Sequence, residues 1–149
     1  MDNPEDRQRL IEEALAQGHK ISPDKVAEIG KDPNGRIVWL EEGKGGKGGA
    51  GLEHVYEHEK EFTDRGIPRE EIGKFAHEAA TEGKYTGYSQ GKPPGRPIFE
   101  IEYGGQRHFV ALTIGSNGFI VGANMKSSKD PFENAWSPAE ADNPTYRGW

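Results

Sequence analysis

The hydrophobic period of the chain changes near Lys84, and this change limits the possible folds more than any other feature. Before Lys84, apolar residues recur at helical spacing; after it they alternate with a period of two, which is typical of strands. The alternating runs cover residues 85–89, 98–103, 107–114 and 119–124. Gly104-Gly105 and Ser116-Asn117-Gly118 separate the later runs and are typical hairpin turns. The second half is therefore predicted to be a four-stranded antiparallel meander.

Amphipathic helices are predicted ahead of this sheet. Pro4 begins the first helix, which Gly18 ends, and the next two cover residues 51–62 and 68–81. Combined with the meander, they predict an α+β fold in which N-terminal helices pack on a four-stranded antiparallel sheet.

Shorter elements are expected between residues 18 and 51. Ser22 caps a brief helical segment that carries Val26 and Ile29, and a turn at 32–35 leads into a strand at 36–41. Residues 43–51 contain six glycines and predict a mobile loop, because they lack the arrangement of a nucleotide P-loop.

A chain of 149 residues has the length of one ordinary domain. Within that domain we divide it into a helix–strand preamble with the glycine-rich loop (1–50), a core (51–125) and a C-terminal tail (126–149).

Composition excludes several kinds of site. The chain has no cysteine, so it holds no disulfide, thiol nucleophile or cysteine-bound metal. No run approaches the roughly 20 apolar residues of a membrane helix, and we expect no membrane segment or signal peptide. The net charge of −6 argues against a general basic surface, yet residues 84–127 hold five Lys and Arg against two Asp and Glu. A ligand that carries phosphate is therefore expected near that segment.

Side chains suited to acid–base chemistry occur on both a helix and a strand. His54 and His58 are four residues apart and project from the same side of their helix. In the 107–114 strand, Arg107 and Thr113 share one face, while the alternate residues from His108 onward share the other. Arg96 stands at the entry to the preceding strand.

These residue types suit RNA cleavage that needs neither metal nor cofactor. A general base takes the proton of the ribose 2′-hydroxyl, a second group protonates the leaving 5′-oxygen, and a cation with hydroxyl or amide donors stabilises the pentavalent phosphate. Because the substrate's 2′-hydroxyl is the nucleophile, RNA would be cut and DNA spared.

Three motifs carry a resemblance to a known family: GLEHVYEH at 51–58, GRPIFEIEY at 95–103 and LTIGSNGFIVGAN at 112–124. Their order resembles the toxin and phage-associated branch of the barnase/EndoU/colicin/RelE-like (BECR-fold) nucleases, over about residues 51–125. The resemblance implies helices packed on a four-stranded sheet that holds RNA. It further implies His54 as the leading catalytic histidine, His58 as its helper, Arg96 as phosphate ligand and Thr113 as transition-state donor.

The resemblance also implies a biological setting. Domains of this family form the tips of polymorphic toxins, secreted or delivered into the cytoplasm of a competitor cell, and an immunity protein neutralises them in the producer. The expected partners are thus an RNA substrate, with tRNA among the candidates, and a cognate immunity protein. The residues expected to contact RNA are Lys84, Lys92, Tyr103, Arg107, Asn117 and Asn124.

Two other functions compete for these residues. His54 to His58 match H-x-x-E-H, a pattern in which two histidines bind zinc and the glutamate activates water, with Glu78 as a third ligand. The other alternative is a module whose aromatic residues bind single-stranded nucleic acid or a protein without cleaving it.

Overall fold

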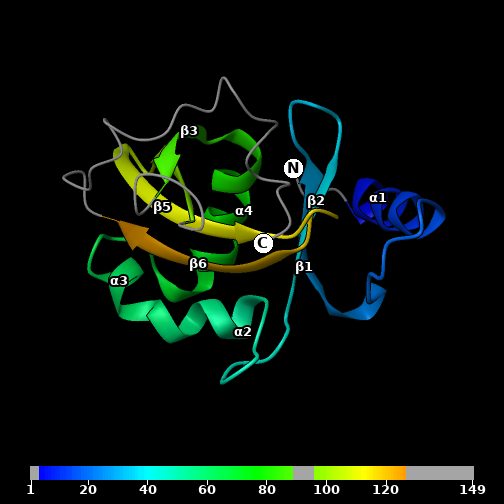
Figure 1. The fold of residues 1–149 in the computed structure, drawn as a ribbon, viewed down its shortest axis with the longest axis horizontal. Helices are drawn as coiled ribbons and strands as arrows, with labels where there is room; N and C mark the ends of the chain where they lie inside the picture. Colours follow the sequence, from blue (N-terminus) through cyan, green and yellow to red (C-terminus); the bar gives the residue numbers. More distant parts are fainter. Residues whose placement is uncertain (1–3, 89–95, 127–149) are drawn as a thin grey trace.

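The computed structural model describes residues 4–88 and 96–126, and Lys92 and the predicted tail beyond residue 126 lie outside them. In chain order the helices and strands are α1 (Pro4–Ala16), β1 (Val26–Lys31), β2 (Ile37–Glu41), α2 (Leu52–Val55), α3 (Glu59–Thr63), α4 (Ile72–Glu82), β3 (Lys84–Tyr88), β4 (Pro97–Tyr103), β5 (Gln106–Ile114) and β6 (Ile120–Lys126) (Figure 1). Single 3₁₀ turns precede β1, link α2 to α3 and precede α4.

The predicted α+β class and four-stranded antiparallel sheet are confirmed. The strands pair in the order β3-β4-β5-β6, every neighbouring pair is antiparallel, and β6 forms one edge. In β5, Val110, Leu112 and Ile114 are fully buried on one face. On the other face Arg107 is exposed and Thr113 half-buried, while Ala111 between them is buried. We call the face of Val110 and Leu112 the inner face of the sheet, and the face of Arg107 and Thr113 the outer face.

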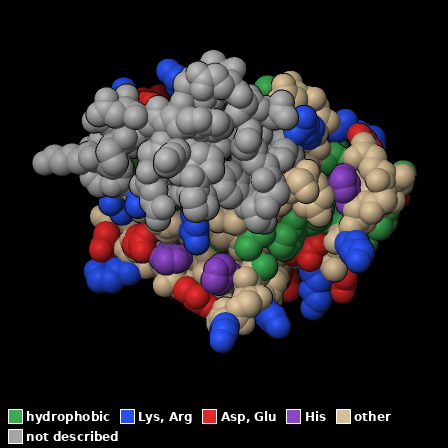
Figure 2. Space-filling view, in the orientation of Figure 1, with side chains coloured by type: hydrophobic (Ala, Val, Ile, Leu, Met, Phe, Trp, Pro, Cys, Tyr) green, Lys and Arg blue, Asp and Glu red, His purple; other side chains and the backbone are tan. Residues whose placement is uncertain are grey.

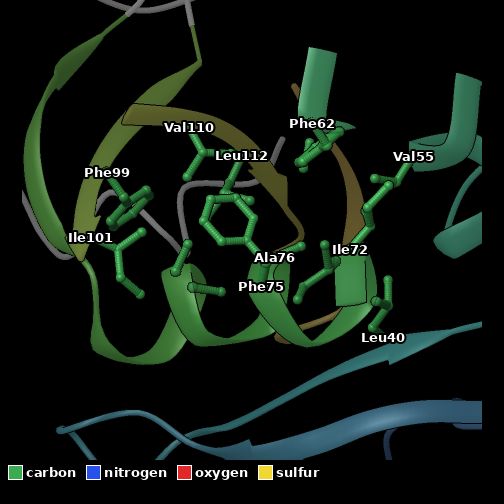
Figure 3. Close-up of a cluster of buried hydrophobic side chains, with 14 of the residues drawn as sticks. Leu40, Val55, Phe62, Ile72, Phe75, Ala76, Phe99, Ile101, Val110 and Leu112 are labelled. Atoms are coloured by element: carbon green, nitrogen blue, oxygen red, sulfur yellow. The ribbon is translucent and has the colours of Figure 1, made fainter. Parts of the chain in front are cut away.

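Helix α4 forms the centre of the main hydrophobic core. Phe75 and Ala76 of this helix are fully buried and belong to one cluster with Val110 and Leu112 of the inner face. The ring of Phe75 meets that of Phe62 edge-on, with 5.9 Å between centroids. The β1–β2 ribbon packs on the other side of α4, so the helix lies between two sheets (Figure 3).

A second hydrophobic cluster joins α1 to the β1–β2 ribbon, and it is centred on the fully buried Trp39. The backbone N–H of Trp39 donates to the carbonyl of Gly118 (3.1 Å). The ring centroids of Trp39 and Phe119 are 5.7 Å apart. Gly118 has a φ of +101°, and a methyl group there would lie 2.1 Å from the carbonyl oxygen of Ile37. The preamble therefore packs directly against the β5–β6 hairpin.

Two helix predictions were wrong in part. Residues 26–31 are strand β1, because pairs such as Ile29 with Trp39 add this segment to β2; only Pro23–Lys25 is helical, as a 3₁₀ turn. The predicted continuous helix at 51–62 is interrupted by a 3₁₀ turn at Tyr56–His58, and His58 leaves the α-helical region with φ −107° and ψ 21°.

Within the described part of the chain, no helix combines the length and apolar character needed to span a membrane.

Candidate active site

The imidazole of His54 lies over Gly122 on the outer face of β6. A methyl group at position 122 would be 3.1 Å from Cδ2 and 3.7 Å from Nε2 of His54, so the missing side chain allows this close approach. Gly122 pairs with Thr113 of β5. Side chains of such cross-strand pairs project to the same face, with Cβ atoms about 5 Å apart. His54 and Thr113 therefore lie at the same part of the outer face.

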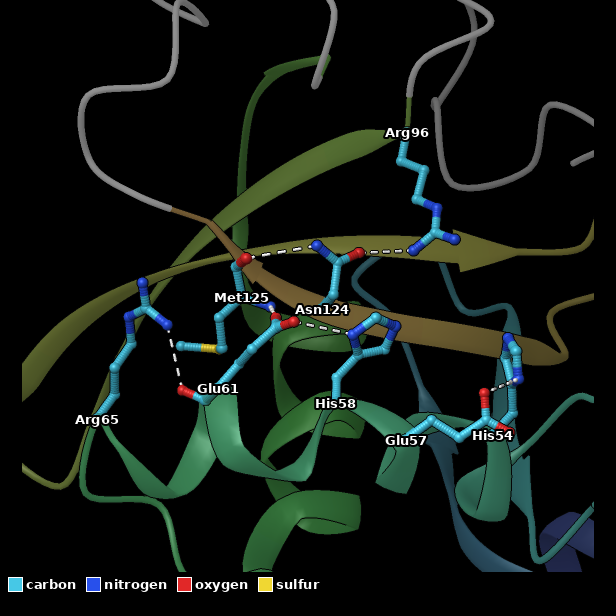
Figure 4. Close-up of polar contacts among 8 residues, drawn as sticks. All are labelled: His54, Glu57, His58, Glu61, Arg65, Arg96, Asn124 and Met125. Atoms are coloured by element: carbon cyan, nitrogen blue, oxygen red, sulfur yellow. Dashed lines mark hydrogen bonds and ion pairs between the residues drawn. The ribbon is translucent and has the colours of Figure 1, made fainter. Parts of the chain in front are cut away.

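Asn124 connects Arg96 to the same stretch of β6. It follows Gly122 by two residues, so it projects to the same face about 7 Å further along the strand. Arg96 Nη1 donates to Asn124 Oδ1 (2.6 Å), and Asn124 Nδ2 donates to the carbonyl of Met125 (3.3 Å) (Figure 4). This places the Arg96 guanidinium beside the outer face that carries His54 and Thr113.

Glu61 orients His58. One oxygen of its carboxylate lies 2.9 Å from His58 Nδ1, and the other accepts the backbone N–H of Met125 (3.1 Å). Because an ionised carboxylate only accepts hydrogen bonds, this contact favours, for a neutral ring, the tautomer with the proton on Nδ1 and the lone pair on Nε2. The ring lies between Glu61 and His54, close under Asn124 (Figure 4).

The second histidine–glutamate pair is looser. His54 Nδ1 is 3.5 Å from Glu57 Oε1, and this buried nitrogen makes no hydrogen bond with the described residues. Glu57 instead accepts the backbone N–H of Gly46, which ties the glycine-rich loop to the 3₁₀ turn. His58 is thus the more firmly oriented of the two imidazoles.

Both histidine segments are fixed to β6. The backbone N–H of Gly51, just before α2, donates to the carbonyl of Val121 (2.9 Å), and Glu61 of α3 accepts from Met125 as described above. On the face of the molecule that carries α2 and α3, histidine side chains reach the surface among acidic and basic ones (Figure 2).

Other predicted RNA contacts lie farther from the histidines. Lys84 is exposed and pairs with Glu100 across β3 and β4. Arg107 is also on the outer face, with its Nε 2.9 Å from Glu100 Oε2. Asn117 lies in the β5–β6 turn, where its Oδ1 accepts the backbone N–H of Phe119 (3.1 Å). That contact gives Asn117 a role in the turn.

Tyr103 is separated from the other candidates by the sheet. Its ring meets Phe75 edge-on on the inner face, 5.2 Å between centroids, and its hydroxyl donates to Glu71 Oε1 (2.9 Å). Burial, followed by the hydrogen bond to Glu71, raises the pKa of the Tyr103 hydroxyl above its ordinary value. The structure therefore does not bring Tyr103 together with His54 and Arg96.

The side chains required for the zinc alternative do not converge in the described residues. No group of three or more His, Asp or Glu side chains in these residues is arranged to hold a metal ion. Glu78 lines a separate cleft between α1, β1 and α4, at 4.0 Å from Lys74 Nζ. The nearest carboxylates to His54 and His58 are instead Glu57 and Glu61, one for each imidazole.

Sequence reasoning missed Glu61, although the spacing carried a signal. A glutamate follows each histidine by three residues, which on a helix puts carboxylate and imidazole side by side. What the spacing does not reveal is the second contact of Glu61, to the backbone of an edge strand 64 residues away.

In comparisons with known proteins, the chain matches no family model and no curated protein sequence. The chemistry of the site is therefore inferred from its own side chains.

Proposed function

We propose that this protein is an endoribonuclease that needs no metal and cleaves RNA by attack of a ribose 2′-hydroxyl on the adjacent phosphodiester. One observation carries the proposal: His54, His58, Thr113 and the Arg96–Asn124 pair gather along a single stretch of β6 and its neighbour β5. Two proton-transfer groups, a cation and neutral donors are the set that this reaction requires.

The oriented imidazole of His58 suits the general base. Nε2 of His58 takes the 2′-hydroxyl proton while the 2′-oxygen forms its bond to phosphorus. The bond from phosphorus to the 5′-oxygen then breaks, and His54, protonated at Nε2, donates a proton to that oxygen. The products are a 2′,3′-cyclic phosphate and a 5′-hydroxyl. Glu61 keeps His58 in the required tautomer by accepting from Nδ1.

Charge on the pentavalent phosphate is stabilised from the sheet. The Arg96 guanidinium, held by Asn124, supplies positive charge, and the Thr113 hydroxyl donates to a non-bridging oxygen. The substrate supplies the nucleophile, which is consistent with a chain that has no cysteine.

The test is incubation of the purified protein with bacterial total RNA in the presence of EDTA, followed by analysis of the fragment ends. We expect fragments with 2′,3′-cyclic phosphate and 5′-hydroxyl ends, and no cleavage of DNA or of 2′-O-methyl RNA. Loss of activity in EDTA that zinc restores would favour the H-x-x-E-H reading instead. RNA that is retarded in a gel but stays intact would favour a binding module.

The proposed setting is that of a toxin with an immunity partner, acting in the cytoplasm of a target cell. Induced expression in a bacterium should arrest growth, and His54→Ala should relieve the arrest. His19→Ala removes a histidine that packs against Trp39, far from the site in the fold, and is the matched control. Undiminished arrest by a folded His54→Ala variant would contradict the assignment of His54.

A further inference from the structure

A second hollow, of about 560 Å³, opens at the far end of the β5–β6 pair from His54. The residues that line it include Asp64 and Arg65 after α3, Arg107 and Phe109 of β5, and Lys126 of β6. Its volume lies within the range of about 300–1,000 Å³ that small-molecule and nucleotide sites occupy. None of the predicted catalytic residues lines it.

Among the described residues that line the hollow, basic side chains outnumber acidic ones. Arg65, Arg107 and Lys126 come from three different elements, and Asp64 is the carboxylate among them. Asp64 is bound by Lys60 Nζ at 3.0 and 3.1 Å, and Glu100 partly offsets the charge of Arg107 at 2.9 Å. Such convergence of basic side chains from separate elements favours an anion.

Both arginines retain hydrogen-bond donors. Arg65 uses Nη1 on the carbonyl of Glu61 (3.1 Å), and Arg107 uses Nε on Glu100 (2.9 Å). A guanidinium carries five N–H donors, so within the described contacts each arginine keeps most of them for a ligand. Planar guanidinium groups bind phosphate oxygens with paired hydrogen bonds.

The hollow continues the row of side chains at the candidate active site. Lys126 and its partner Phe109 project to the same face as Asn124 and Gly122. From Gly122 to Lys126 is four residues, or about 13 Å of strand. An RNA chain with its cleaved phosphate beside His54 and Arg96 would thus reach the hollow with a neighbouring nucleotide.

We propose that this hollow is a flanking subsite that binds a nucleotide near the cleaved bond. Arg65 and Arg107, which both line the hollow, bind the phosphate of that nucleotide. The path of the RNA from the cleaved bond to the hollow rests on the proposed function. Binding of a phosphate in the hollow rests on the side chains that line it.

Fluorescence anisotropy tests the subsite without cleavage. The probe is a short fluorescein-labelled RNA of mixed sequence with a 2′-O-methyl group on every ribose. We expect Arg107→Ala to raise the Kd about tenfold, and to lower the slope of log K against log salt by about 0.7, as loss of one phosphate contact on a single strand does.

Arg9→Ala is the matched control. Arg9 and Arg107 have similar side-chain exposures, 67% and 69%, and each is paired with one carboxylate, but Arg9 lies on α1. Arg9→Ala should leave the Kd and the slope unchanged. A Kd and slope for Arg107→Ala equal to those of the wild type, or no binding of the probe by the wild type, would overturn the subsite.

The two proposals fail separately. Binding that depends on Arg107 in a protein that leaves total RNA intact would end the ribonuclease proposal and keep the subsite. If the protein cleaves RNA but Arg107→Ala leaves the Kd for the probe unchanged, the subsite is ended and the ribonuclease proposal is kept.

Discussion

The inner and outer faces of β5 and β6 are made by alternate residues of the same strands, yet they differ in the chemical type of their side chains. Val110, Leu112 and Ile114 are fully buried on the inner face, against α4. The outer face carries Thr113 and Asn124 beside His54 of α2 and His58 of the 3₁₀ turn. Residues that stabilise the core and residues of the candidate site therefore alternate along the same strands, so that either group can be substituted without changing the other.

Histidines show the same contrast. His108 on the inner face is 5% exposed and packs edge-on against Phe75, whereas the His58 side chain is 37% exposed and hydrogen-bonded to Glu61. Burial lowers the pKa of the His108 imidazole below its ordinary value. One residue type is thus a neutral core group on one side of the sheet and a proton-transfer candidate on the other.

The largest effect on chemistry is expected for His58→Ala. Removing a general base costs about 10²- to 10⁴-fold in rate, and here it removes no core contact. The initial rate of RNA cleavage checks the loss, and thermal melting checks the fold. A variant that melts at the wild-type temperature and cleaves at the wild-type rate would break the assignment of chemistry to the outer face.

Phe75→Ala should have the largest effect on the fold. Phe75 is fully buried beneath the inner face, and truncation of such a ring costs about 3–5 kcal/mol. Urea denaturation gives the free energy of unfolding directly. Exposed Leu15→Ala is the control, with a change expected within about 0.5 kcal/mol.

Glu61→Gln tests how His58 is held. Glutamine can accept one of the two hydrogen bonds through its oxygen but carries no charge, so we expect cleavage to fall about 10- to 100-fold with an altered pH–rate profile. The matched change Glu57→Gln should cost less, because Glu57 lies 3.5 Å from His54 without a hydrogen bond. Equal losses of cleavage rate in the two variants would contradict the conclusion that Glu61 orients His58 more firmly than Glu57 orients His54.

Gly122→Ala should give a smaller loss. The added methyl lies 3.1 Å from His54 Cδ2, so the ring must shift by a few tenths of an ångström. We expect cleavage to drop by several-fold while the melting temperature hardly changes. An unchanged cleavage rate would show that catalysis does not depend on the present position of the His54 ring over β6.

The smallest effect is a pH dependence of stability. Since the folded pKa of His108 is lower than the unfolded one, the unfolded chain binds more protons as pH falls below about 6.5. His108 therefore lowers the free energy of unfolding as pH falls through about 6.5 toward its folded pKa. In His108→Phe this part of the pH dependence should be missing between pH 7 and pH 5, measured by urea denaturation at each pH.

Sequence patterns predicted the sheet well because apolar residues recur at every second position of its inner face, as at Val110, Leu112 and Ile114. The hydrophobic period of β5 assigned Arg107 and Thr113 to one face and His108 to the other, as the structure has them. Residues 26–31 were assigned to a helix instead, because two apolar residues at helical spacing cannot reveal a partner strand. These residues form a strand because they pair with β2, as Ile29 does with Trp39, and that pairing is a tertiary contact.

The candidate site was predictable in its residue types and less so in its geometry. Residue spacing brought His54 and His58 together, but the contacts of Glu61 with Met125 and of Arg96 with Asn124 span distant parts of the chain. Tyr103 was grouped with the RNA contacts by residue type alone. The alternation of β4 places it with Phe99 and Ile101 in the core, a pattern that the same period-two reasoning would have found.

The two attachments of the histidine segment to β6 set its permitted length. Gly51 and Glu61 are ten residues apart, on either side of the 3₁₀ turn, and their partners Val121 and Met125 are four residues apart, about 13 Å of strand. One residue inserted or deleted between His54 and His58 would rotate one imidazole by about 100° relative to the other, and one elsewhere between Gly51 and Glu61 would shift an attachment to β6. Variation in length is therefore compatible with the site in the glycine-rich loop before Gly51, whereas the eleven-residue stretch must keep its size.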